Sequence, residues 1–425
     1  MNARPAHEPT REFSPSHKLL NDATRNSKCL GCPSCPDFKV CGGLNIDADV
    51  YDCNDLCSCA NPDLCDMVCR NKPVTFFERF MEVGGFELDT VPRVSSVAAA
   101  ALPVFVPLID HKHSRKATLL EPVVAVSLFD LFHRGTGEPL VRNREELADR
   151  FLIRRDAVLV VSGVDRDVKI EAWWALANRQ NILKTLRHLG VALVTTPNFS
   201  LFTNVPRPDN LHGMKRIALS WAQLMSAGIP AALHVNARTE HDYARWARFV
   251  ADRAEVESIA FEFGTGAGYP GRINWHVEQL CQLADNVERN LTLVVRGGVH
   301  VLHQLRKHFA RVILIDTDSF ARTLKRRRAT VTATGRLRWV QTQTPRDAPI
   351  DDLLMHNIAT RREVLSQITS AAPVVLERAF RAPRRPTQDA DRQPWQRSFV
   401  KQFEASLQAG AVPIDLKGVI AASES

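Results

Sequence analysis

The chain has 425 residues, 45% of them hydrophobic, which is enough for one large globular domain with appendages. No run of 18 uncharged apolar residues occurs and the N-terminus lacks an apolar stretch of signal-peptide type, so the sequence excludes a membrane-spanning helix and predicts a cytoplasmic protein. The formal charge of +8 is concentrated late in the chain, where residues 322–404 carry 17 Lys and Arg against 8 Asp and Glu.

The N-terminal part divides into two segments. Residues 1–27 are polar and show no hydrophobic periodicity, which predicts a disordered arm. Residues 28–72 form a cysteine-rich module that holds nine of the ten cysteines. These nine are Cys29, Cys32, Cys35, Cys41, Cys53, Cys57, Cys59, Cys65 and Cys69.

The spacing of these cysteines favours metal binding. An odd number of thiols in a chain without an export signal argues against disulfides. Short spacings such as the C-x2-C-x2-C opening let neighbouring thiolates reach one ion or cluster. That opening is similar to the loops of bacterial ferredoxin-type proteins, and both an iron-sulfur cluster of the 4Fe-4S type and zinc remain open. Nine thiolates suffice for two four-ligand sites, and the spacing does not assign the ligands to either.

The sequence pattern of residues 73–322 predicts an α/β fold, a (β/α)8 barrel of the TIM type. Eight short runs rich in Val, Ile, Leu and Ala show no polar alternation, as parallel strands buried on both faces do, and most are followed by a helical pattern. The runs cover 103–110, 123–132, 157–163, 191–200, 231–237, 258–264, 291–298 and 311–318. Only residues 111–122 separate the first two runs, which leaves no room for a helix there.

Polar residues end these runs, and in such a barrel they meet at the carboxyl ends of the strands, where barrel enzymes hold their active sites. We expect catalytic side chains from the third, fifth, sixth and eighth runs, namely Asp165, His234, Glu262 and Asp316. The expected substrate-binding residues are Asp110, His111, Asn198, Ser200, Arg207, Asn236, Gly266, Gly268, Arg296, Gly297, Gly298 and Asp318. For each of them, an ordinary polar strand end is the alternative interpretation.

Two loops that contain these residues suggest binding of an anion. The loop with Gly266 and Gly268 opens onto a helix N-terminus that can approach a phosphate or a ribose. Arg296, Gly297 and Gly298 follow the seventh strand, where barrels of this type often bind phosphate.

Residues 323–425 predict a basic C-terminal extension. A hairpin turns near Thr334 and Gly335, a helix follows over 351–368, and a Pro- and Arg-rich linker leads to a last amphipathic helix. The arginines of the hairpin and Trp339 suit a phosphate backbone with one stacking residue, so tRNA or DNA is a candidate partner. A solvated charged surface is the alternative.

Taken together, the strand-end aspartates, the thiolate module and the basic extension resemble the tRNA-guanine transglycosylase superfamily at the level of architecture. The resemblance implies an aspartate nucleophile that attacks the ribose carbon and a second aspartate as general base, and Asp165 and Asp316 occupy the matching strand ends. It departs from the family in the cysteines, since the family's zinc ligands lie late in the chain and no cysteine follows Cys281 here.

The sequence therefore favours a metal- or iron-sulfur-containing barrel enzyme that modifies or exchanges a nucleobase in nucleic acid. Two alternatives remain open. One is an iron-sulfur redox enzyme or lyase that acts on a small phosphorylated substrate, and the other is a non-enzymatic, nucleic-acid-binding regulatory protein.

Overall fold

The computed structural model describes Arg79 and residues 82–370, apart from 112–113, 177–178, 203–206, 269–271, 334 and 346. The predicted arm (1–27), the cysteine-rich module (28–72) and residues 371–425 of the basic extension lie outside the described residues.

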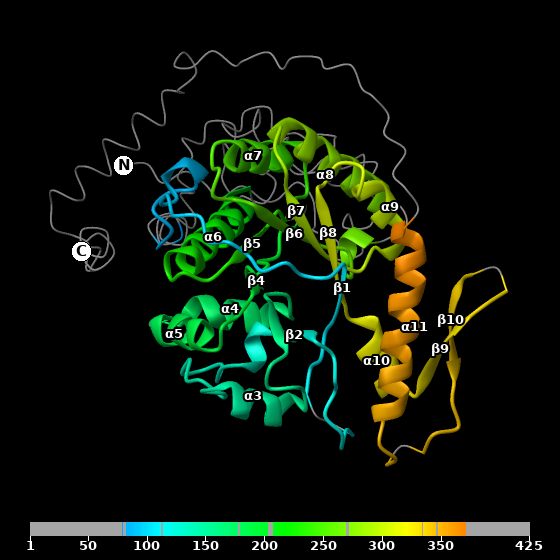
Figure 1. Cartoon of the computed structure of the whole chain (residues 1–425). Helices are drawn as coiled ribbons and strands as arrows, with labels where there is room; N and C mark the ends of the chain where they lie inside the picture. The colour runs from blue at the N-terminus through cyan, green and yellow to red at the C-terminus, as the bar shows by residue number, and fades with distance from the viewer. Residues whose placement is uncertain are drawn as a thin grey trace, which may run out of the picture.

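Eight parallel strands form the centre of the molecule, as the sequence predicts (Figure 1). They are β1 (Phe105–Pro107), β2 (Val123–Ser127), β3 (Val158–Ser162), β4 (Leu193–Thr195), β5 (Ala231–His234), β6 (Ser258–Glu262), β7 (Thr292–Arg296) and β8 (Arg311–Asp316). Their order is β1-β8-β7-β6-β5-β4-β3-β2, and a parallel bridge between Leu108 and Ala125 brings β1 back to β2. The Ile109 N–H donates to the Ala125 carbonyl at 2.8 Å, so the sheet curves into a TIM-type barrel.

Helices surround the strands (Figure 1). The α-helices are α3 (Arg144–Phe151), α4 (Asp167–Ala175), α5 (Gln180–His188), α6 (Arg207–Ser226), α7 (Glu240–Ala251), α8 (Ile273–Val287), α9 (Leu302–Leu305), α10 (Asp318–Leu324) and α11 (Asp351–Ser370). The 3-10 helices are η5 (Leu88–Thr90), η6 (Leu128–Asp130), η7 (Gly266–Gly268) and η8 (Val299–Val301). No helix occurs in the described residues of the connection between β1 and β2, as its length predicts.

Alternate strand residues belong to two different cores. One position of each strand packs with the surrounding helices, and the next packs inside the barrel, which is the alternation expected of a closed sheet. The interior cluster comprises Leu102, Val106, Leu108, Ala125, Val160, Leu193, Ala232, Ala260, Val294, Ile313 and Ile315. Because Leu102 precedes β1 and packs into this cluster, apolar side chains also fill the barrel at the amino ends of the strands.

Two helices differ from the sequence prediction. The pattern that contains Trp173 and Leu186 predicts one helix, but α4 ends at Ala175 and α5 begins at Gln180. The prolines and asparagines of residues 195–210 predict an irregular loop after β4, whereas α6 already begins at Arg207. A proline at position 208 fits the first turn of a helix, where its missing N–H costs no hydrogen bond.

The predicted basic hairpin is present as β9 (Arg327–Val331) and β10 (Leu337–Gln341), which pair antiparallel. It lies between α10 and α11 in the sequence and projects beside α11 at the outside of the molecule (Figure 1). Beyond the hairpin, α11 returns to the barrel and lies against β1, α9 and α10. The hairpin is therefore an insertion ahead of a helix that completes the outer ring.

Residues 82–93, which we call the strap, run across the helices toward β1 (Figure 1). At its start, Glu82 lies 2.8 Å from the His212 ring at the beginning of α6. Further along, Lys215 donates to the Glu87 carbonyl and Arg253 donates to the Pro92 carbonyl at 3.1 Å. Since α6 begins at the carboxyl side of the barrel and Arg253 follows the end of α7, the strap spans the barrel from one end to the other.

Candidate active site

A layer of polar side chains closes the interior of the barrel at the carboxyl ends of the strands. In seven strands, the residue two positions beyond an interior apolar residue is polar or charged, so the alternation directs it into the barrel. The layer consists of Asp110, Ser127, Ser162, Thr195, His234, Glu262 and Arg296. Four of the predicted site residues, Asp110, His234, Glu262 and Arg296, belong to it.

A cluster of carboxylates around one lysine occupies the β1–β3 side of this mouth. The Lys169 ammonium donates to Asp165 Oδ2 at 2.8 Å and to Asp130 Oδ1 at 3.0 Å. Asp165 Oδ2 also accepts from Ser127 Oγ at 3.1 Å, and its Oδ1 accepts from the Arg166 N–H at 2.8 Å. Asp165 is thus held by three donors around its carboxylate.

Two carboxyls of this mouth have pKa shifts of opposite sign. Burial raises the pKa of Asp110, and the negative charges of Asp130 and Asp165 raise it further against the opposing charge of Arg296. Burial also acts to raise the pKa of Asp165, but the hydrogen bonds from Lys169 and from the Arg166 N–H outweigh it, and the pKa is lowered. The surroundings of Asp110 therefore favour the protonated form more than solvent does, while those of Asp165 favour the ionised form.

Lys169 remains a cation in this arrangement. Burial acts to lower its pKa, but the hydrogen bonds to Asp165 and Asp130 outweigh it and raise the pKa. Because a charged ammonium is a poor nucleophile, the arrangement favours orientation of Asp165 by Lys169 over Schiff-base chemistry.

Arg296 and Glu262 form a second charged group on the β6–β7 side. Arg296 Nη1 donates to the Val164 carbonyl at 2.8 Å and to Ser162 Oγ at 3.3 Å, and its Nε lies 3.2 Å from Glu262 Oε2. Burial raises the pKa of Glu262, and the charge of Arg296 opposes that rise. The guanidinium is largely engaged by the protein itself.

His234 is a buried, neutral ring. Burial lowers its pKa to about 3, and the ring Nδ1 lies 2.6 Å from the Thr196 carbonyl. Because a carbonyl only accepts, Nδ1 carries the proton and Nε2 is an acceptor. His234 can therefore accept a hydrogen bond at neutral pH, but it cannot act as a charged acid there.

Predicted substrate-binding residues on the β4 and β5 loops lie nearby. Asn236 Nδ2 donates to the Phe199 carbonyl at 2.8 Å, and Ser200 Oγ donates to Asp167 Oδ1 at 2.6 Å. The buried Asn198 Oδ1 has no hydrogen-bond partner among the residues that the structure describes. The side chain of Arg207 lies outside the described residues.

Asp316 and Asp318 lie apart from the mouth. Asp316 lies two residues after the helix-facing Leu314, so its side chain points to the same face of β8. Its carboxylate accepts from Arg361 Nε of α11 at 3.0 Å. Arg361 Nη2 also donates to Asp318 Oδ2 at 2.9 Å. The ring of His111 packs edge-on against Phe320 of α10 at 5.5 Å between centroids. The structure does not bring these residues together with Asp165.

The predicted glycines serve close packing between loops. A Cβ on Gly268 would lie 1.8 Å from the Phe263 carbonyl oxygen, and one on Gly298 would lie 2.7 Å from the Phe263 ring. Gly297 has a φ of +72° and would also meet the backbone at Gly264. Gly266 lies in η7, the turn that brings this loop against β6.

Asp130 and Ser162 are polar strand ends that the sequence also identifies, but sequence reasoning missed Ser127, Thr195 and Lys169. The two hydroxyls follow from the strand alternation, since each lies two residues after an interior apolar residue. Lys169 lies on α4, four residues after Asp165, and the i,i+4 spacing of opposite charges is the signal that predicts this contact.

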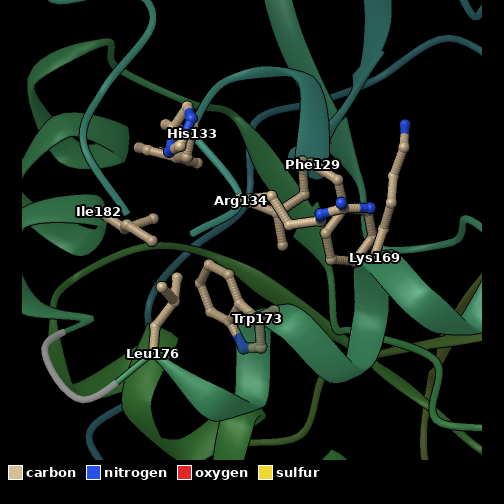
Figure 2. Close-up of a pocket in the computed structure, with 9 residues that line it drawn as sticks. Phe129, His133, Arg134, Lys169, Trp173, Leu176 and Ile182 are labelled. Carbon is tan, nitrogen blue, oxygen red and sulfur yellow. The ribbon is translucent and has the colours of Figure 1, made fainter. Parts of the chain in front are cut away.

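A pocket of about 240 Å³ adjoins the carboxylate cluster (Figure 2). Apolar and aromatic side chains form most of its wall, and three basic side chains lie at its edge. The lining residues are Leu128, Phe129, Phe132, His133, Arg134, Lys169, Trp173, Leu176 and Ile182. Lys169 thus contributes both to this pocket and to the mouth.

No family model matches this chain, and no curated protein matches it. In the part of the chain that the structure describes, no three His, Cys, Asp or Glu side chains are grouped to hold a metal ion. None of the described helices has the length and apolarity needed to cross a bilayer. The nine cysteines proposed as metal ligands lie outside the described residues.

Proposed function

We propose that this barrel is an enzyme that cleaves an N-glycosidic bond and exchanges or modifies a nucleobase in nucleic acid. The observation that carries the proposal is the pair of carboxyls at one mouth with opposite pKa shifts, Asp110 raised and Asp165 lowered. Chemistry at a glycosidic carbon uses such a pair, one carboxylate as nucleophile and one carboxylic acid as proton donor.

In the proposed reaction, an oxygen of the ionised Asp165 bonds to the C1′ carbon of the sugar while the bond between C1′ and the base nitrogen breaks. Asp110 gives its proton to the departing base, whose nitrogen takes the electron pair of the broken bond. An incoming base or water then attacks C1′, transfers its proton to Asp110 and releases Asp165. Lys169 and Ser127 hold the nucleophile in place during both steps.

We propose nucleic acid as the partner because of the hairpin. Residues 319–346 contain eight Lys and Arg and no Asp or Glu. In the β9–β10 register, Arg338 is opposite Thr330 and Arg328 is opposite Val340, so both arginines lie on one face, and both are exposed. A protruding cationic face of this kind suits contacts to phosphates.

We also retain the proposal that the N-terminal cysteines bind a 4Fe-4S cluster or zinc, which rests on their spacing alone. Iron, sulfide and zinc analysis of anaerobically purified protein tests it. Less supports a small phosphorylated substrate at Arg296, since Val164, Ser162 and Glu262 already engage that guanidinium.

The test of the proposed function is replacement of the nucleophile. Unfractionated tRNA and sheared genomic DNA are incubated with radiolabelled guanine or adenine, and both label incorporation and released bases are measured. We expect activity with the wild-type protein and a loss of at least about 1,000-fold in Asp165→Asn. The matched control is Asp156→Asn, an exposed carboxylate paired only with Arg154. Full activity of Asp165→Asn would exclude its role as nucleophile.

A further inference from the structure

We propose that the pocket beside the carboxylate cluster is the subsite for the base of the nucleotide unit on which the enzyme acts, with Arg134 positioned for the adjoining phosphate. This inference rests on the proposed function, because it identifies where the base of that substrate binds. The occupant is a base that belongs to a nucleic acid strand, turned out of its stack.

The walls of the pocket suit a flat ring. Figure 2 shows Phe129, Trp173, Leu176 and Ile182 around the pocket, and Phe132 is a third aromatic residue of its lining. Enzymes that act on a base hold it between aromatic and apolar side chains, since every base has a π face that stacks. Phe129 is only half-buried, so part of its surface is open to such a ring.

A compact turn holds the basic edge of the pocket in place. The His133 N–H donates to the Glu138 carbonyl and the Gly137 N–H donates to the His133 carbonyl, each at 2.8 Å. Gly137 has a φ of +71°, and a Cβ there would lie 3.3 Å from Leu176, so the turn packs directly against the pocket wall. The turn thereby fixes the backbone on which His133 and Arg134 are carried.

Arg134 is a cation available to a ligand. It is exposed, and within the described part of the chain it makes no ion pair or side-chain hydrogen bond. A guanidinium at the edge of an aromatic pocket matches a phosphate attached to a stacked base. The positive charge of Arg134 and the aromatic walls of the pocket therefore both suit a nucleotide unit.

Lys169 connects this pocket to the proposed nucleophile. Its side chain lines the pocket, while its ammonium lies 2.8 Å from Asp165 Oδ2. A base that binds in the pocket therefore contacts Lys169, the same side chain that donates a hydrogen bond to Asp165.

The experiment measures binding apart from catalysis. A short single-stranded DNA and a matching RNA, each carrying one 2-aminopurine, are titrated into full-length Asp165→Asn protein, and the fluorescence of that base is recorded. We expect quenching on binding, because the probe stacks on aromatic side chains. In the Asp165→Asn background, Phe129→Ala should weaken binding by roughly 5- to 150-fold and reduce the quenching. Arg134→Ala should weaken binding while the quenching at saturation persists.

Arg155→Ala, a change at an exposed arginine away from the pocket, serves as the control and should bind unchanged. Thermal melting of each variant establishes that it is folded. If 2-aminopurine riboside monophosphate alone binds as tightly as the oligonucleotides, the pocket serves free nucleotides and the strand assignment is overturned. Unchanged binding in Phe129→Ala would overturn the pocket itself, even if base exchange is observed. Intact stacking in Asp165→Asn together with no base exchange by the wild-type protein would instead refute the proposed function alone.

Discussion

At the level of single residues, the electrostatic contrast between Asp110 and Asp165 predicts a distinct pH dependence. Asp165 must be ionised, and its lowered pKa keeps it so down to acidic pH. Asp110 must be protonated to act as the acid, so kcat/KM falls as pH rises through its raised pKa. We expect an acidic optimum in the pH profile of base release. Asp110→Asn should lower the rate by about 100- to 10,000-fold. It should also abolish the alkaline limb, which is the fall of kcat/KM at high pH.

The control for this prediction is Asp149→Asn, an exposed carboxylate on α3. It should preserve both limbs of the profile. An unchanged alkaline limb in Asp110→Asn would show that another group donates the proton.

The strand-end residues illustrate what the sequence can predict at this scale. The sequence correctly predicts Asp110, Glu262 and Arg296 at the mouth because each of them ends an apolar run. Asp316 ends such a run too, but it faces Arg361. Both faces of a barrel strand are apolar, so the composition of β8 does not reveal which of its alternate positions point inward. That information resides in the register between strands, which only the folded sheet defines.

At the level of elements, the β9–β10 hairpin predicts a salt-dependent interaction. Each phosphate contact releases counterions, so log Kd for tRNA should rise steeply with log salt concentration. Arg328→Gln and Arg338→Gln should each reduce that slope by about 1 in fluorescence anisotropy titrations. Arg155→Gln, at an exposed arginine of the barrel, should not change it. A flat salt response of the wild-type protein would contradict binding through phosphates.

The sequence also predicts most elements, but not how they associate. The strands, the hairpin and the helix that is α11 all appear where the pattern places them. Asn357 of α11, for example, donates to the Arg327 carbonyl of β9 and to Thr323 Oγ1 of α10. Such contacts join residues about 30 positions apart, and no local pattern encodes them.

At the level of the whole molecule, the strap makes stability depend on pH. Burial lowers the pKa of Lys215 to about 8, so between about 8 and 10.5 the unfolded chain binds more protons than the folded one. The free energy of unfolding should therefore rise with pH across this window, by up to about 3 kcal/mol. Below the window, the charged and buried Lys215 lowers the free energy of unfolding by this full amount. Urea unfolding at several pH values measures this.

Comparison with Lys215→Met isolates the contribution of this one group, since the variant should lack the rise. Lys184→Met, at an exposed position of α5, should retain it. Parallel pH profiles for the wild-type protein and Lys215→Met would contradict the assignment.

The packing of Leu102 inside the barrel has a kinetic consequence. Because apolar side chains fill that end, a substrate reaches Asp165 from the carboxyl side of the barrel. In the proposed reaction, the departing base leaves on this side before the incoming base takes its place. Initial rates measured at several concentrations of both reactants should give parallel double-reciprocal lines, the signature of double displacement.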